Sequence, residues 1–285
     1  MKTFLYRVLC GFFLGLSIFA PGFSGSVMAI IMGIYEEFVH IMSNPFKRFK
    51  YNVMFCLPLI IGALFSAALF VIAFDYLLRT YEKALYFLFA GLIAGNLPLI
   101  FNKVKDCGFK KHYLIGGIGA FGIILPLCVF AMSAQGIESE AANIGLIMMA
   151  LNGFAAGIFA LVPGMSISTI LIITGVYAPL IFMAKSFLEA DFGYTLHLSV
   201  FAVCAVLGVV FISKGIKAVF EKYPGFASAA MLGFVAGSMI GIMIQGIRLE
   251  SNNFNWIAGG VMLALGFGVS VLFAALGKIM KQKPE

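Results

Sequence analysis

Long apolar stretches, each separated from the next by a short polar segment, occupy almost the whole sequence. We count ten such windows, at residues 4–20, 27–42, 53–74, 84–101, 113–134, 144–162, 169–184, 196–213, 226–244 and 256–276. A helix needs roughly 20 mostly apolar residues to cross the hydrocarbon core of a bilayer. The pattern therefore predicts an all-α polytopic membrane protein.

Two pairs of neighbouring windows are joined by a Pro-Gly step instead of a polar loop. The first pair reads FAPGFSGSVMAIIMGIYEE and contains Pro21 and Gly22, and the second reads LVPGMSISTILIITGVYAP and contains Pro163 and Gly164. Unpaired backbone groups are costly in hydrocarbon, so such a break survives only inside protein or beside a wet cavity. We therefore predict two broken helix pairs, each either re-entrant or fully spanning.

The two broken pairs belong to an internal repeat with an offset of 142 residues. At this offset GLIAG at 91–95 also matches GFVAG at 233–237. The single-residue identities are Gly11/Gly153, Phe12/Phe154, Gly15/Gly157, Pro21/Pro163, Gly22/Gly164, Ser24/Ser166, Ser26/Ser168, Ile30/Ile172, Ile31/Ile173, Gly33/Gly175, Tyr35/Tyr177 and Tyr81/Tyr223. Because the offset is half the chain and holds across separated segments, we predict two repeats, residues 1–142 and 143–285.

Composition and charge add the expected orientation. The chain is 62% hydrophobic and 11% charged, with a mean hydropathy of +1.06, whereas soluble domains average about 45–50% apolar and about 25% charged. The net charge of +7 comes from short loops, so it reports membrane orientation and not nucleic-acid binding. The smaller set of basic residues, on the predicted outer side, is Arg79, Lys83, Lys185 and Arg248. The positive-inside rule then places both termini in the cytoplasm.

This orientation makes each half cross the membrane an odd number of times. The first half starts inside and the second starts outside, so the halves run antiparallel. The predicted fold is two inverted-topology repeats, each a Pro-Gly-broken helix pair plus three transmembrane helices. Inverted repeats with discontinuous helices are a recurring transporter design, with the substrate site near the midplane where the repeats meet.

Small hydroxyl residues after each break supply the candidate chemistry. Ser and Thr favour helix N-caps, and a helix N-terminus offers free N–H groups that bind anions, phosphate especially. Two such ends entering from opposite sides would share one pocket. The candidate binding residues are Pro21, Gly22, Ser24, Gly25, Ser26, Pro163, Gly164, Ser166, Ser168 and Thr169.

A packing alternative stays open beside that interpretation. Small residues let membrane helices approach closely, and Gly11/Gly15 and Gly153/Gly157 have the spacing of such contacts. Capping alone would also explain the serines.

Other polar residues in the apolar windows are few. Glu36 and Glu37 lie about 15 Å of helix beyond Ser26, which favours an interfacial or gating role over a deep proton relay. Tyr35 and Tyr177 are candidates either for substrate contact or for an interfacial aromatic belt. Two asparagines within apolar windows, Asn96 and Asn152, are predicted interhelical hydrogen bonders.

The motifs PGFSGS…GIY at 21–35 and PGMSIS…GVY at 163–177 resemble the duplicated PGxSG…GxY pattern of the polyprenyl-phosphate transporter family, formerly a domain of unknown function. The resemblance covers essentially the full length, although Ile167 stands where the family commonly has a second glycine. It implies a flippase that returns undecaprenyl phosphate to the inner leaflet of the bacterial cytoplasmic membrane, for reuse in peptidoglycan synthesis. The head group would bind at the paired helix ends, and the isoprenoid would stay in the bilayer.

Two other classes compete with this interpretation. An ion-coupled transporter or channel for a small anion would use the same helix-end pocket, sealed from the lipid. A lipid-phosphate phosphatase would need a base beside the serines, and no His or Asp lies near them in the sequence. We therefore predict a non-enzyme without cofactor or metal, and leave coupling to a proton or sodium gradient open. The four outer basic residues are interpreted either as a capture site for the head group or as solvated loop charges.

Overall fold

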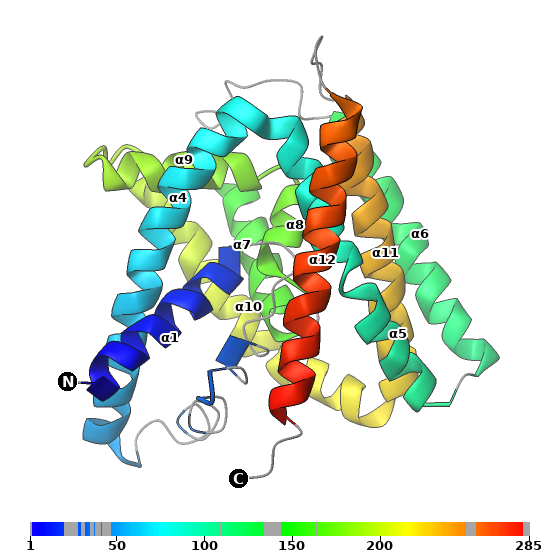
Figure 1. Ribbon diagram of the computed structural model, residues 1–285, viewed down its shortest axis with the longest axis horizontal. Coiled ribbons are helices and arrows are strands. Elements are labelled where there is room, and N and C mark those ends of the chain that lie inside the picture. The colour runs from blue at the N-terminus through cyan, green and yellow to red at the C-terminus, as the bar shows by residue number, and fades with distance from the viewer. Residues whose placement is uncertain are drawn as a thin grey trace.

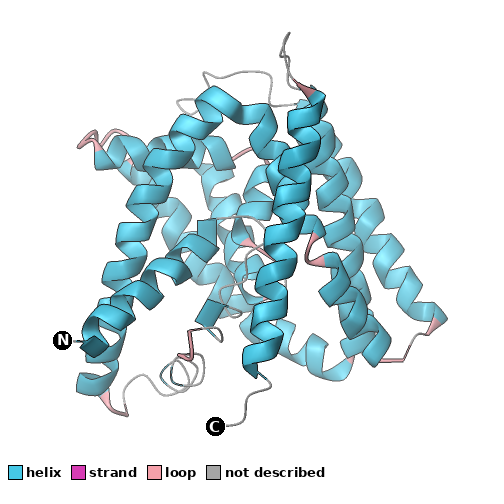
Figure 2. Cartoon of the chain, in the orientation of Figure 1, coloured by secondary structure: helices cyan, strands magenta, loops and turns pink. Residues whose placement is uncertain are grey.

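The computed structural model describes residues 2–19, 28–29, 32–34, 37, 41, 47–108, 110–133, 144–162, 165–248 and 255–281. Within these ranges all regular secondary structure is helical (Figures 1 and 2). The helices are α1 (Lys2–Phe19), α4 (Phe49–Ala94), α5 (Leu97–Asp106), α6 (Lys111–Ser133), α7 (Leu146–Leu161), α8 (Ile167–Ile173), α9 (Tyr177–Leu188), α10 (Thr195–Lys222), α11 (Pro224–Arg248) and α12 (Trp256–Lys281).

The helices bear out the predicted class, a polytopic membrane protein. By length and composition, three helical segments of the described chain are candidate spans: Phe49–Asp106, Pro224–Arg248 and Trp256–Leu276. The bent pair formed by α8 and α9 would be a fourth. The outward faces of α4, α10 and α12 carry large apolar side chains, including Phe65, Phe211 and Ile257, that are more than half exposed. Such surface is stable only against lipid or another apolar partner.

Helix α4 merges two of the predicted windows into one element. It runs through 46 residues and departs from helical geometry at Tyr81, where φ is −133° and ψ is 33° and the helix is kinked. In Figure 1 the helix rises to the top of the molecule and turns over there. The segment between the windows, DYLLRTYEK, contains no Gly or Pro, so nothing in it ends the helix. Tyr223, 142 residues further on, has nearly the same conformation, with φ −132° and ψ 56°, between α10 and α11.

The window at 169–184 was predicted as one helix, and that prediction is wrong. The structure divides it into α8 and α9, which are bent by 112°. The turn uses Gly175, whose φ of 76° lies in the left-handed region that glycine enters without a Cβ penalty. Gly33, its counterpart in the repeat, has φ of 63°. The glycine of the GxY motif therefore makes the same kind of turn in both halves.

The glycine pairs predicted to pack helices together do so in both halves. A Cβ atom on Gly11 would collide with the backbone of Leu59, and one on Gly15 would meet Ala63. In the second half, Gly153 lies against Phe201 and Gly157 against Ala205, which are the same partners shifted by 142 residues. Residue numbers rise together on both sides of each contact, so α1 runs in the same direction as the first part of α4, and α7 as α10. In the second half, the segment that contains α8 and α9 therefore leads back to the side of the molecule on which α7 begins.

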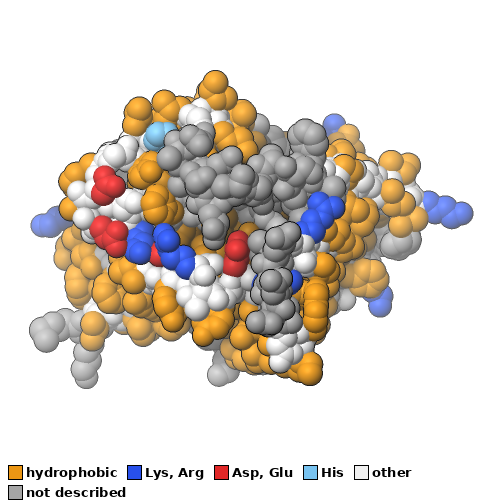
Figure 3. Space-filling model, turned by 90° about the horizontal axis from the view of Figure 1, so that it is seen from above, with side chains coloured by type: hydrophobic (Ala, Val, Ile, Leu, Met, Phe, Trp, Pro, Cys, Tyr) orange, Lys and Arg blue, Asp and Glu red, His pale blue; other side chains and the backbone are white. Residues whose placement is uncertain are grey.

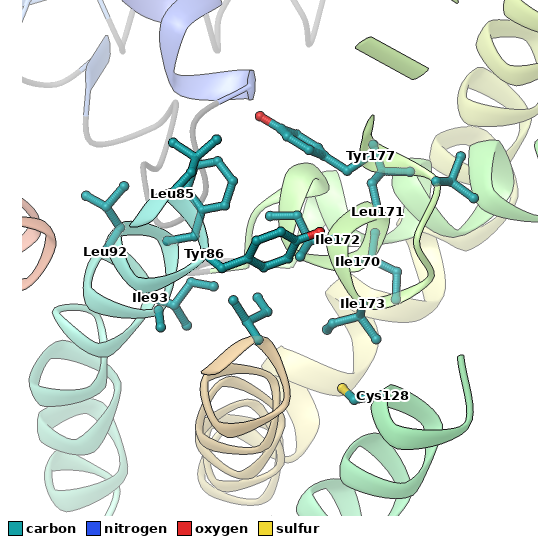
Figure 4. Packing of buried hydrophobic residues seen from close by; sticks show 14 of the residues in the cluster. Leu85, Tyr86, Leu92, Ile93, Cys128, Ile170, Leu171, Ile172, Ile173 and Tyr177 are labelled. Carbon is teal, nitrogen blue, oxygen red and sulfur yellow. The ribbon is translucent and has the colours of Figure 1, made fainter. Parts of the chain in front are cut away.

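The remaining helices of each half pack on helices of the other half. Helix α6 packs on α11, and α12 packs on the second part of α4. Gly91 of α4 lies against the backbone of Leu263, while its counterpart Gly233 lies against that of Gly117. The largest buried cluster forms where α4, α8, α9 and α11 meet, and Figure 4 shows Tyr86 of α4 pointing toward α8 there.

Candidate functional site

The predicted site residues divide into two groups. Ser166, Ser168, Thr169 and Tyr177 of the second copy, together with Glu37, are described by the structure. The others lie outside the described residues: Pro21, Gly22, Ser24, Gly25, Ser26, Tyr35, Glu36, Pro163 and Gly164. The geometry of the site is therefore that of the second break.

Ser166 occupies the N-cap position of α8, as the sequence indicated. Its backbone is extended, with φ −117° and ψ 141°, but its side chain makes no capping hydrogen bond. Instead the hydroxyls of Ser166 and Ser168 hydrogen-bond to each other at 2.7 Å, and both side chains are buried. The two hydroxyls form one small polar patch at the break and do not bond the helix start.

Helix α8 lies where the two halves of the chain meet. It contacts α1 and α6 of the first half and α7, α9 and α11 of the second. Its residues from Ser168 to Ile173 are all buried. The polar patch at its start is thus held inside the bundle, among apolar neighbours from both halves.

The turn after α8 is tied to α7 by a polar side chain. The Thr174 hydroxyl donates to the Asn152 Oδ1 at 2.5 Å, and the Asn152 amide donates to the Met148 carbonyl of its own helix at 3.0 Å. Asn96 likewise accepts a hydrogen bond from Ser270 Oγ on α12 at 3.4 Å. The prediction that both asparagines join helices is confirmed.

Tyr177 lies in the core, not in an interfacial belt. It is 5% exposed and packs edge-on against Phe89 of α4, with ring centroids 5.7 Å apart. A second buried tyrosine in the same cluster, Tyr86, accepts a hydrogen bond from Gln245 Nε2 at 3.2 Å. Sequence reasoning missed Tyr86 and Gln245, because neither belongs to a motif or a matched position of the repeat.

The basic residues predicted on the outer side have three different environments. Lys83 is buried, with Nζ 4.9 Å from the centre of the Trp256 ring. Arg248 is exposed at the end of α11. Arg79 and Lys185 both bind the buried carboxylate of Asp75, a residue that the sequence analysis did not single out. Asp75 directly follows the apolar window at 53–74 and opens the polar segment between two windows, so its charge did not stand out as one inside a span.

Comparison with known proteins agrees with the motifs. Residues 14–257, which include both breaks, match a protein family described as undecaprenyl phosphate translocase-like. The chain belongs to this family. The resemblance seen in the duplicated PGxSG…GxY pattern is thereby confirmed.

Two curated relatives carry the same name. A polyprenyl-phosphate transporter of Staphylococcus aureus is 31% identical over 280 residues, covering 96% of each chain. A polyprenyl-phosphate transporter of Vibrio cholerae is 25% identical over 253 residues, covering 83% of this chain and 77% of the relative. No solved structure matches the chain significantly.

Proposed function

We propose that this protein returns undecaprenyl phosphate from the outer to the inner leaflet of the bacterial cytoplasmic membrane, so that the lipid carrier is reused for envelope polymers such as peptidoglycan. Family membership and the names of the two relatives support the substrate class. The termini would be cytoplasmic, as the distribution of basic residues predicts.

The proposed architecture is two inverted repeats, residues 1–142 and 143–285. It is supported by contacts and conformations that recur at one offset: Gly11 on Leu59 with Gly153 on Phe201, and the left-handed turns at Gly33 and Gly175. Each half then contributes a helix that enters the membrane, breaks and returns. Rocking of one half against the other would expose the site to alternate leaflets.

The observation that carries the proposal is the buried polar break between α7 and α8. Among the described residues, the hydroxyls of Ser166 and Ser168 hydrogen-bond to each other, at 2.7 Å, in a region where α8 touches both halves. Such hydroxyls are able to donate to phosphate oxygens, and an ionised acceptor strengthens such bonds. In the proposal, Ser24 and Ser26 contribute the same groups from the first half. The exposed apolar faces of α4, α10 and α12 would accommodate the isoprenoid tail.

A leaflet-resolved assay of undecaprenyl phosphate in proteoliposomes tests the proposal. The Ser166→Ala/Ser168→Ala double variant, and separately Ser24→Ala/Ser166→Ala, should lower the transport rate about tenfold or more, because each loses charge-assisted hydrogen bonds to the head group. Ser238→Ala is the matched control, since that buried hydroxyl donates to the Val235 carbonyl of its own helix and, among the described residues, bonds no other element. Unchanged transport in both double variants would refute the pocket.

The same liposomes separate the proposal from its main competitor. A small-anion transporter would move inorganic phosphate into the lumen while undecaprenyl phosphate stayed in its leaflet. In the proposal Glu36 and Glu37 act at the cytoplasmic boundary as gating or coupling groups. Replacing both with Gln should then shift the pH or sodium dependence of transport, and an unaltered profile would return them to an interfacial role.

A further inference from the structure

One ion-pair network joins distant parts of the described chain. Lys185 Nζ of α9 lies 2.7 Å from Asp75 Oδ2 of α4, across 110 residues of sequence and between the two proposed repeats. Arg79 Nε donates to both oxygens of the same carboxylate at 3.0 Å. Asp75 therefore holds two cations from two halves of the molecule at once.

The three charges differ sharply in exposure. The side chain of Asp75 is 8% exposed, whereas that of Lys185 is 28% and that of Arg79 is 60% exposed. The Arg79 guanidinium also lies 5.8 Å from the centre of the Phe182 ring of α9. Figure 3, seen from above Figure 1, shows basic and acidic side chains side by side on this face within an apolar surround. A ligand arriving from this side would meet the cations before the carboxylate.

The network belongs to the elements that bend. Asp75 and Arg79 lie just before the bend of α4 at Tyr81, and Lys185 lies in α9, beyond the 112° turn from α8. The corresponding positions of the other repeat carry different residues in the sequence. At the offset of 142, Asp75, Arg79 and Lys185 correspond to Lys217, Glu221 and Ser43. The sequence therefore allows this ion-pair network at one end of the molecule and not at the corresponding positions of the other repeat.

We propose that Asp75, Arg79 and Lys185 form a phosphate-exchange latch, in which the phosphate of an isoprenoid lipid displaces the Asp75 carboxylate from the two cations. This inference rests on the proposed function and assigns it an entry site at one face. A carboxylate and a phosphate monoester offer the same paired oxygens to Arg and Lys. Binding of the lipid head would break the Asp75–Lys185 ion pair between α4 and α9, so arrival of substrate removes one contact between the two halves.

Binding of farnesyl phosphate to the purified protein in nanodiscs, measured by titration calorimetry, tests the latch. Asp75→Asn removes the carboxylate that binds both cations, while Lys185 keeps the exposed Glu189 carboxylate at 3.7 Å. This variant should raise the affinity about tenfold, whereas Arg79→Gln and Lys185→Gln should each lower it about tenfold. Arg248→Gln is the matched control, because it removes an exposed charge outside the network, at the end of α11 where Gly246 lies against Tyr86 and Phe87 of α4. It should change the affinity less than about twofold, as an exposed charge outside the network contributes little.

The diagnostic result is a change in affinity of opposite sign in the two variants of the Asp75–Lys185 ion pair: a rise in Asp75→Asn and a fall in Lys185→Gln. A purely structural ion pair would shift the affinity in the same direction in both variants, or not at all, and either result would overturn the latch. If inorganic phosphate bound with the same affinity as farnesyl phosphate, the assignment to a lipid would be overturned. The same holds if farnesol bound as tightly as farnesyl phosphate. Because Arg79 is largely exposed, its variant is expected to fold, and monodisperse elution with a wild-type helical spectrum checks this for all variants.

The outcome is separable from that of the proposed function. If the wild-type protein moves undecaprenyl phosphate while the three variants bind farnesyl phosphate as it does, the latch fails and the transport proposal stands. If the wild-type protein moves no lipid, the transport proposal fails whatever the variants bind.

Discussion

Replacing Gly33 or Gly175 with Ala should destabilise the protein through the backbone alone. Both glycines have positive φ, at 63° and 76°, and an L-residue pays about 1–2 kcal/mol to adopt that conformation. At Gly33 an added Cβ would meet no described atom within 4 Å, so steric contact adds nothing there. We expect the free energy of unfolding to fall by about 1–2 kcal/mol at Gly33 and by at least as much at Gly175.

Unfolding by SDS in mixed micelles, followed by the fluorescence of the single tryptophan, measures this effect. Trp256 packs edge-on against Phe87, with ring centroids 6.2 Å apart, so its environment changes when α12 leaves α4. Gly268→Ala is the control: this exposed helical glycine has no described neighbour within 4 Å, and Ala should stabilise it by up to about 1 kcal/mol. Gly33→Asn should cost less than Gly33→Ala, because Asn enters the left-handed region more readily. If Gly33→Ala and Gly268→Ala change the stability with the same sign, the turn is not fixed by its backbone conformation.

Three further substitutions give simpler expectations. Gly157→Leu should prevent folding, seen as aggregation on size-exclusion chromatography, because a Cβ alone already collides with Ala205. Ser66→Ala should keep or raise the midpoint of SDS unfolding, since this fully buried hydroxyl has no partner among the described residues; a lower midpoint would contradict that. Asn152→Ala should lower the unfolding free energy by only about 1 kcal/mol, because Thr174 keeps a hydrogen bond to the Ile170 carbonyl at 3.0 Å. A loss of roughly 3 kcal/mol or more, the size expected for truncating a core side chain, would refute this reasoning.

The parts of the fold that the sequence predicted are those that need a particular small residue. Glycine is required where two helix backbones touch, so the sequence marked Gly11, Gly15, Gly153 and Gly157 as residues of close helix contacts, although it did not say which helices they meet. The matched glycines Gly33 and Gly175 likewise marked a repeated feature. They were not interpreted as turns, because an apolar run of helical length around them outweighed a single glycine. Pro179, four residues after Gly175, was a further sign that the helix does not continue unchanged.

The site was harder to predict because its polar residues find partners far along the chain. Ser166 was placed correctly at the start of a helix, but its bond to Ser168 replaces the expected cap. Asp75 and Lys185 are 110 residues apart, and hydrophobic periodicity contains no information on which loop meets which helix end. Counting charges placed Lys185 on one side of the membrane; only the packing of α9 against α4 brings it to Asp75.

The difference in charge between the two ends bears on the direction of transport. In the proposal, the latch residues Asp75 and Arg79 correspond to Lys217 and Glu221 at the opposite end, so the two ends bind the head group with unequal affinity. Unequal affinities change the rates of entry and release, but a carrier without an energy source still brings the lipid to equal activity in both leaflets. A net return to the cytoplasmic leaflet then requires consumption of the lipid there or coupling to an ion gradient. In proteoliposomes without a gradient, undecaprenyl phosphate loaded into either leaflet should therefore reach the same final distribution, and a proton or sodium gradient should move that distribution only if transport is coupled. A final distribution that depends on the leaflet loaded, in protein that is still active, would contradict a reversible carrier.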